Sequence, residues 1–87
     1  MIFLYILVGS ITVATRLKKL IERVVGYPAD VVHTPEGLNK GGCSYSVRAD
    51  DRLKSMIIPF SEEYSIPIKK IYTMEIVDGE RVYHVVS

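Results

Sequence analysis

The chain begins with a run of seven apolar residues that is too short to cross a membrane but long enough for a buried strand. The run, Ile2 to Val8, is rich in β-branched and aromatic residues, which is typical of a central strand covered on at least one face. We expect no signal peptide, because the run lacks a basic segment before it and a small-residue cleavage site after it. Gly9 and Ser10 end it well short of the roughly 20 apolar residues of a membrane-spanning helix.

An amphipathic helix is predicted directly after this strand, over residues 11–25. Ser10 can cap its first turn by accepting a hydrogen bond from a backbone N–H. Gly26 fits the left-handed residue that commonly ends a helix, and Pro28 prevents any continuation. The apolar positions recur at steps of three and four, which places them on one face of the helix: Val13, Leu17, Leu20, Ile21 and Val24.

Two short strands are predicted on either side of a glycine-rich loop. Val31 and Val32 are β-branched and indicate a strand over residues 29–33. Residues 43–48 alternate small or polar side chains with larger ones, which is typical of another strand. The intervening residues 36–43 contain three glycines, a composition that indicates a loop.

A second helix is predicted after the third strand, with Asp50 as its candidate N-cap. Its apolar stripe has helical spacing: Leu53, Met56, Ile57, Phe60 and Tyr64. Pro59 lies inside this stripe, and a proline costs roughly 3 kcal/mol in a regular helix interior. Two alternatives remain. We favour a helix kinked near residues 55–58 over a split in which Pro59 opens a new turn.

The last part of the chain is predicted to form a β-hairpin. Residues 68–77 have a strand pattern, and residues 80–86 return as a final strand. Asp78-Gly79 between them is the strongest turn signal in the chain, because both central residues of such a tight turn need positive φ.

The whole order of predicted strands and helices indicates one α+β domain over residues 1–87. Its fold class is a ferredoxin-like βαββαβ sandwich, with two helices on one face of an antiparallel sheet and an extra C-terminal hairpin strand.

Charge and cysteine content narrow the classes of function. Eleven Lys and Arg side chains balance ten Asp and Glu side chains, so no excess charge predicts binding to nucleic acid or to an acidic membrane. A single cysteine excludes an internal disulfide framework and a cysteine-rich zinc site. A free thiol is most common in the cytoplasm, which is the location we expect.

Cys43 is the candidate nucleophile, because it is the sole cysteine and follows Gly41 and Gly42 directly. Glycines allow a partner to approach the backbone closely, and a glycine-rich turn can present N–H donors to an anion. Such donors and nearby cations favour the reactive thiolate. Neighbours in sequence offer hydroxyls and positive charge: Lys40, Ser44, Ser46 and Arg48. The alternative is that Cys43 is a small buried hydrophobic residue beside a flexible connector.

The two histidines carry a weaker signal. His33 ends a predicted strand next to the loop, where it could act as a general base or stabilise a thiolate, or simply pack against its neighbours. His84 lies in the terminal hairpin and is interpreted as structural or exposed. This scatter of His and Cys predicts no metal site. No phosphate loop or dinucleotide fingerprint is present, so no cofactor is expected.

The residues around Cys43 follow the order of a known family. The pattern consists of Thr34-Pro35, Leu38, Gly42-Cys43 and a strand that ends in Arg48. The later segment 66–72 is similar to the end of a helix and the last core strand of the same family. From the first strand to about Glu75, the chain resembles the selenium/sulfur carrier protein-like family of small bacterial proteins.

This resemblance implies a carrier role rather than a stand-alone enzyme. Cys43 would accept sulfur or selenium as a persulfide or perselenide and pass it to a partner enzyme, which needs one accessible thiolate and no second cysteine to resolve it. The supporting loop residues are then Thr34, Pro35, Gly41, Gly42, Ser44 and Arg48.

Two other hypotheses stay open. Small domains of this fold often bind a metabolite or an enzyme, so the chain could be a non-catalytic binding or regulatory module. The chain could also be a structural subunit that forms a homodimer through the edge strand around residues 83–86. Neither hypothesis predicts a nucleic-acid or membrane partner.

Overall fold

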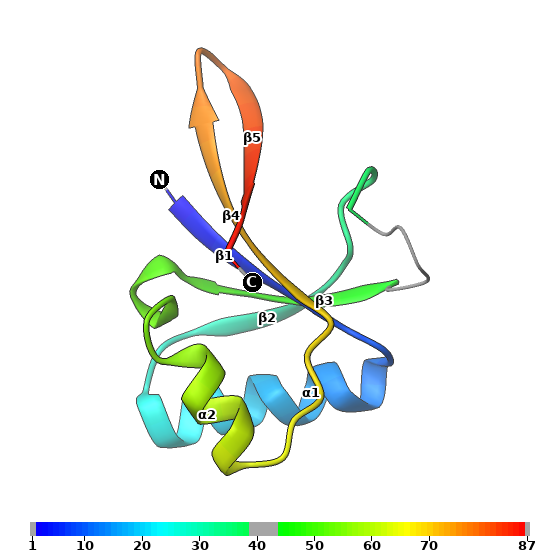
Figure 1. Ribbon diagram of the computed structural model, residues 1–87, viewed down its shortest axis with the longest axis vertical. Coiled ribbons are helices and arrows are strands. Elements are labelled where there is room, and N and C mark those ends of the chain that lie inside the picture. The colour runs from blue at the N-terminus through cyan, green and yellow to red at the C-terminus, as the bar shows by residue number, and fades with distance from the viewer. Residues whose placement is uncertain (1, 39–43, 87) are drawn as a thin grey trace.

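The computed structural model describes residues 2–38 and 44–86, which contain two α-helices and five strands (Figure 1). The strands are β1 (Ile2–Val8), β2 (Ala29–His33), β3 (Tyr45–Asp50), β4 (Lys70–Val77) and β5 (Glu80–Val85). The helices are α1 (Ile11–Leu20), which continues into a π-helical turn at Ile21–Val25, and α2 (Ile57–Glu63), which is preceded by a 3-10 turn at Asp51–Leu53. None of these helices is long and apolar enough to span a membrane.

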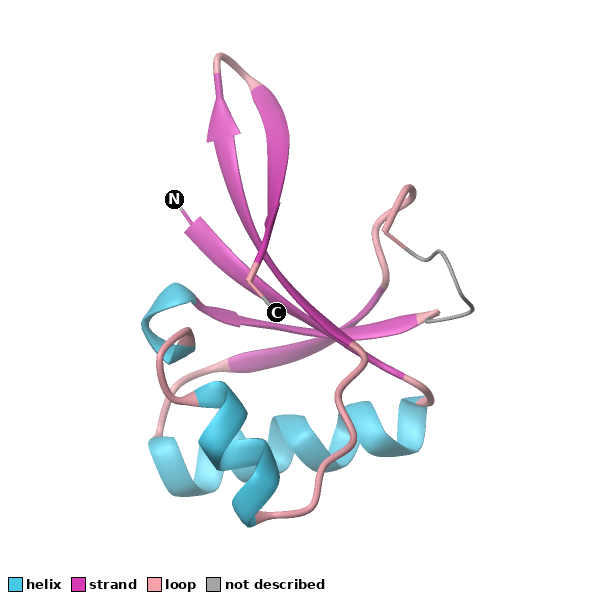
Figure 2. Cartoon of the chain, viewed as in Figure 1, coloured by secondary structure: helices cyan, strands magenta, loops and turns pink. Residues whose placement is uncertain are grey.

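The strands form one sheet in the order β2-β3-β1-β4-β5, and every neighbouring pair is antiparallel. Both helices lie on the same face of this sheet (Figure 2). The prediction of an α+β chain with an antiparallel sheet and two helices on one face is therefore confirmed. β2 and β5 are the two edges, and β1 is central.

The apolar run of the sequence is explained by β1, which is buried on both faces. Tyr5 and Leu7 face away from the helices, yet they are only 4% and 1% exposed. They belong to what we call the helix-free cluster: Tyr5, Leu7 and Met74 with Phe3, Val32, Leu38, Tyr72 and Tyr83 around them. The alternate side chains of β1 are fully enclosed in the main core, with apolar residues of both helices: Leu4, Ile6 and Val8.

The first helix begins and ends where the sequence predicts. Ser10 caps it, because its Oγ accepts a hydrogen bond of 3.2 Å from the N–H of Val13. Gly26 ends the following π-helical turn with a left-handed φ of 84°. The π-helical turn itself was not predicted from the sequence.

The second helix differs from the favoured prediction. Pro59 does not kink a long helix but lies in the first turn of the short α2, where a missing backbone N–H removes no bond within the helix. The split alternative is therefore the correct one. Asp50 caps the separate 3-10 turn by accepting a bond of 2.8 Å from the N–H of Arg52. Met56, which was placed on the apolar stripe, is 38% exposed because it lies in the break between the two segments.

The C-terminal hairpin follows the sequence prediction. Asp78 and Gly79 have φ values of 51° and 80°, as a two-residue turn requires. This turn fixes the register of β4 on β5, in which Val77 is opposite Glu80 and Tyr72 is opposite Val85. Figure 1 shows the hairpin extending away from the helices.

Candidate functional site

The predicted site lies in the connection between β2 and β3, which we call the Cys43 loop (residues 34–44). Gly41, Gly42 and Cys43 itself lie outside the described residues, as does Lys40. The structure therefore describes both ends of the loop, 34–38 and Ser44.

The two ends of the Cys43 loop are joined by backbone and side-chain hydrogen bonds. The N–H of Thr34 donates to the carbonyl oxygen of Ser44 at 2.9 Å, which adds one bond to the ladder between β2 and β3. The hydroxyls of Thr34 and Ser46 are hydrogen-bonded at 2.7 Å, and both residues are buried. Since an unpaired buried hydroxyl is costly, this pair ties the start of the loop to β3.

The first residues of the loop form a tight turn. The N–H of Leu38 donates to the carbonyl oxygen of Pro35 at 3.0 Å, and Gly37 has a φ of 92°. A positive φ at this position is what glycine provides without steric cost. The turn brings the Leu38 side chain against the helix-free cluster, so the loop is held by an apolar contact as well as by hydrogen bonds.

The residue that follows Cys43 is on the surface. Ser44 is exposed and lies just before β3. Across the ladder from β3, the His33 ring stacks on the Tyr45 ring, with centroids 5.1 Å apart and an angle of 31° between the planes. His33 is exposed at the end of β2. The described end of the loop thus combines an exposed serine with an imidazole nearby.

Arg48 lies at the other end of β3, four residues beyond Ser44 and therefore about 14 Å along the strand. Its guanidinium donates to the Asp30 carboxylate at 3.2 Å and lies 5.3 Å from the centre of the Phe3 ring. The hydrogen bond to Asp30 raises the pKa of Arg48 above its ordinary value. The Arg48 side chain therefore lies apart from the described ends of the Cys43 loop.

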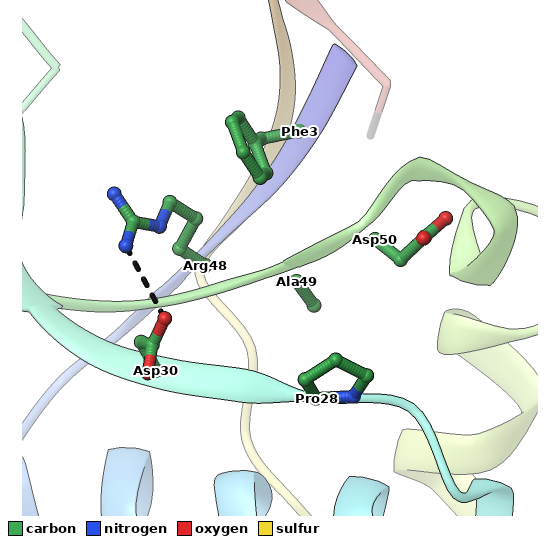
Figure 3. A pocket seen from close by; sticks show the side chains of 6 residues that line it. All are labelled: Phe3, Pro28, Asp30, Arg48, Ala49 and Asp50. Atoms are coloured by element: carbon green, nitrogen blue, oxygen red, sulfur yellow. Dashed lines mark hydrogen bonds and ion pairs between the residues drawn. The ribbon is translucent and has the colours of Figure 1, made fainter. Parts of the chain in front are cut away.

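Arg48 lines a pocket of about 210 Å³ on the sheet (Figure 3). It is lined by Phe3, Pro28, Asp30, Arg48, Ala49 and Asp50. Figure 3 shows the ion pair of Arg48 and Asp30 on one side and the Asp50 carboxylate on the other. The pocket therefore combines apolar side chains with charges of both signs.

Sequence reasoning did not find the partners of these residues. The sequence pattern does not point to Asp30, and it indicates Ser46 only as a hydroxyl near Cys43. The register supplies both contacts, because Asp30 lies opposite Arg48 and Val32 opposite Ser46. These contacts could be predicted only from the register of β2 on β3. The long loop between the two strands leaves that register undetermined in the sequence.

The described residues do not provide a metal centre. In residues 2–38 and 44–86, no three His, Cys, Asp or Glu side chains gather as they would around a metal ion. What the described part of the loop can offer is anchored backbone, hydroxyls and a solvent-facing end.

The chain matches a known protein family. Residues 3–73 match the family described as "Putative Se/S carrier protein-like". No curated protein and no solved structure matches the chain. Because the matched segment covers most of the 87 residues and includes Cys43, the chain belongs to this Se/S carrier protein-like family.

Proposed function

We propose that Cys43 carries one sulfur or selenium atom as a persulfide or perselenide. In the loading step, the Cys43 thiolate attacks the terminal sulfur of a donor persulfide, R–S–SH. A new bond forms between the Cys43 sulfur and the transferred sulfur, and the S–S bond of the donor breaks to release the thiolate R–S⁻. The proton stays on the transferred sulfur. No electron is gained or lost overall.

The discharge step is the same chemistry in reverse. A nucleophile on a partner enzyme attacks the terminal sulfur, the bond within the persulfide breaks, and the Cys43 thiolate is regenerated. A second cysteine in the chain could intercept the persulfide and form a disulfide, but Cys43 is the sole cysteine of the sequence. A reducing compartment would keep the unloaded thiol free, so we place the protein in the cytoplasm.

The family membership over residues 3–73 is the observation that carries this proposal. The described ends of the loop add support. Ser44 is exposed directly after Cys43, while Thr34 and Ser46 hold the base of the loop through buried hydroxyls. An exposed residue beside the cysteine, on an anchored base, suits a group that two different enzymes must reach.

We further infer that the fold is ferredoxin-like. In the order β2-β3-β1-β4, β3 separates β1 from β2 and β1 separates β3 from β4. Each half is therefore a strand–helix–strand unit with a strand of the other half between its two strands. β5 is the additional strand.

Intact-mass measurement tests the proposal. The folded protein is incubated with a low-molecular-weight persulfide, and we expect a mass increase of one sulfur atom per chain that a reductant removes. Cys43→Ser should show no increase under the same conditions. A wild-type protein that stays unmodified while it remains folded would contradict the proposal.

A second candidate function has one observation in its favour, the pocket between Phe3 and Arg48. Its apolar side chains and mixed charges would suit a small zwitterionic metabolite, and such a binding module would not need Cys43. In that case, Cys43→Ser would leave ligand binding unchanged, whereas Arg48→Met would weaken it. NMR chemical-shift changes at Ala49 on addition of amino acids would distinguish the two functions.

A further inference from the structure

β5 lies at the edge of the sheet and has a neighbouring strand on one side only within the described part of the chain. Its residues Glu80, Arg81, His84 and Val85 are exposed, and Val85 has an exposed fraction of 62%. A regular edge strand of this kind is a template for pairing with another strand.

The hydrogen bonds of the hairpin show which backbone groups of β5 point outward. The N–H of Val86 donates to the carbonyl oxygen of Ile71 at 2.8 Å, so Val86 belongs to a hydrogen-bonded pair. Such pairs alternate with non-hydrogen-bonded pairs along an antiparallel ladder. The backbone groups of Arg81, Tyr83 and Val85 therefore point away from β4, toward the open edge.

We propose that β5 pairs antiparallel with β5 of a second copy of this chain, about a two-fold axis that passes between the two Val82 residues. Glu80 of each copy then lies opposite His84 of the other, and Arg81 opposite Tyr83. The pairs of Arg81 and Tyr83 exchange the outward backbone hydrogen bonds. The result is a continuous ten-stranded sheet from two five-stranded ones.

Charge complementarity selects this register. The Glu80 carboxylate can accept a hydrogen bond from the His84 ring of the other copy, and the Arg81 guanidinium can lie on the opposite Tyr83 ring, each twice by symmetry. A two-fold axis at Arg81 would instead place two guanidinium groups opposite each other. An axis at Tyr83 would place Glu80 opposite Val86 and Arg81 opposite Val85, which leaves every charge without a partner across the new ladder.

The other edge strand does not have these properties. Pro28 directly precedes β2 and has no backbone N–H to donate. Asp30, the acidic residue of β2, is paired with Arg48 at 3.2 Å, whereas the pairing of His84 in β5 with Glu75 of its own chain is longer, at 3.7 Å. The second copy is therefore expected at β5 rather than at β2.

Cysteine cross-linking tests the register directly. In a Cys43→Ser background, Val82→Cys places two thiols in a non-hydrogen-bonded pair, whose Cα atoms are about 4.5 Å apart and can be bridged. Tyr83→Cys is the matched control, because in this register its two copies are about 8 Å apart, beyond disulfide reach. We expect oxidised glutathione to give a disulfide-linked dimer with Val82→Cys and none with Tyr83→Cys. Cross-linking at Tyr83→Cys alone, or at neither position, would overturn the proposal.

A second pair of variants tests the backbone contribution. Arg81→Pro removes an outward N–H without removing a bond to β4, whereas Arg81→Ala keeps that N–H and removes the side chain. Two intermolecular hydrogen bonds are lost by symmetry in the proline variant. We therefore expect its dimer dissociation constant, measured by sedimentation velocity, to rise about tenfold or more above that of Arg81→Ala. Equal constants for the two variants, or a wild-type protein that is monomeric at every concentration, would refute the pairing. The pairing does not depend on the chemistry of Cys43.

Discussion

The two hairpins of the sheet, β2–β3 and β4–β5, hold their strands in register in different ways. Asp78 and Gly79 connect β4 to β5 in two residues, and their positive φ values set the register through the backbone alone. The Cys43 loop is long, so its backbone cannot set a register. There the buried hydroxyls of Thr34 and Ser46 and the packing of Leu38 add to the backbone hydrogen bonds that hold the two strands together.

This difference shows where each hairpin has room for function. A two-residue turn has no residues to spare, so the β4–β5 hairpin can offer only its strand edge to a partner. A long loop on a side-chain anchor can vary in its middle without losing the register of its strands. The sulfur or selenium transfer that we propose belongs to the long loop between β2 and β3. The pairing with a second copy belongs to the β4–β5 hairpin.

The largest effect is expected at the hydroxyl pair. Thr34→Val keeps the side-chain shape but leaves the Ser46 hydroxyl buried and unpaired, since Ser46 has no exposed surface. We expect the free energy of unfolding to fall by roughly 1–3 kcal/mol in urea denaturation. The double variant Thr34→Val/Ser46→Ala should recover most of this loss. A single variant as stable as the wild type would show that the pair does not anchor the loop.

A smaller effect is expected at the tight turn. Gly79→Ala forces a residue with a Cβ into a φ of 80°, although no atom lies within 4 Å of the added Cβ. The cost is therefore conformational, about 1 kcal/mol in the free energy of unfolding. Gly37→Ala is the matched control, with a φ of 92° and equally open space. We expect it to cost less, because the register of β2 on β3 does not depend on a two-residue turn. A greater cost at Gly37 would remove the distinction between the two hairpins.

The smallest effect is expected at the far end of β3. The Arg52 side chain and backbone N–H donate hydrogen bonds to Asp50 and lower the pKa of its carboxyl. Because the folded-state pKa is lowered, the stabilisation is present above the unfolded-state pKa and is lost as pH falls through the folded-state pKa. Asp50→Asn should thus lower Tm slightly near neutral pH and not at strongly acidic pH. A Tm difference that does not change with pH would exclude the ionised carboxyl as its source.

The sequence predicted the elements better than the contacts between them. The strand Ile2–Val8, the cap at Ser10 and the turn at Asp78-Gly79 depend on local chemistry, and all three are confirmed. Pro59 was ambiguous, because a proline is tolerated in a first turn and disruptive in an interior, and only packing decides where the helix begins.

The candidate site shows the same contrast between local sequence signals and contacts that depend on the fold. Cys43 stands out by its uniqueness in the sequence, but its role stays a prediction. The pairs of Thr34 with Ser46 and of Arg48 with Asp30 join residues 12 and 18 positions apart. They depend on the hairpin register, which the loop composition does not determine.

The most direct test of the carrier proposal is the rate of Cys43 alkylation in the folded protein as a function of pH, followed by intact mass. The proposal predicts fast labelling without unfolding, with a half-reaction point well below the roughly 8.5 of a free thiol. Labelling that requires denaturant would mean that Cys43 is a buried structural residue and would contradict the carrier function.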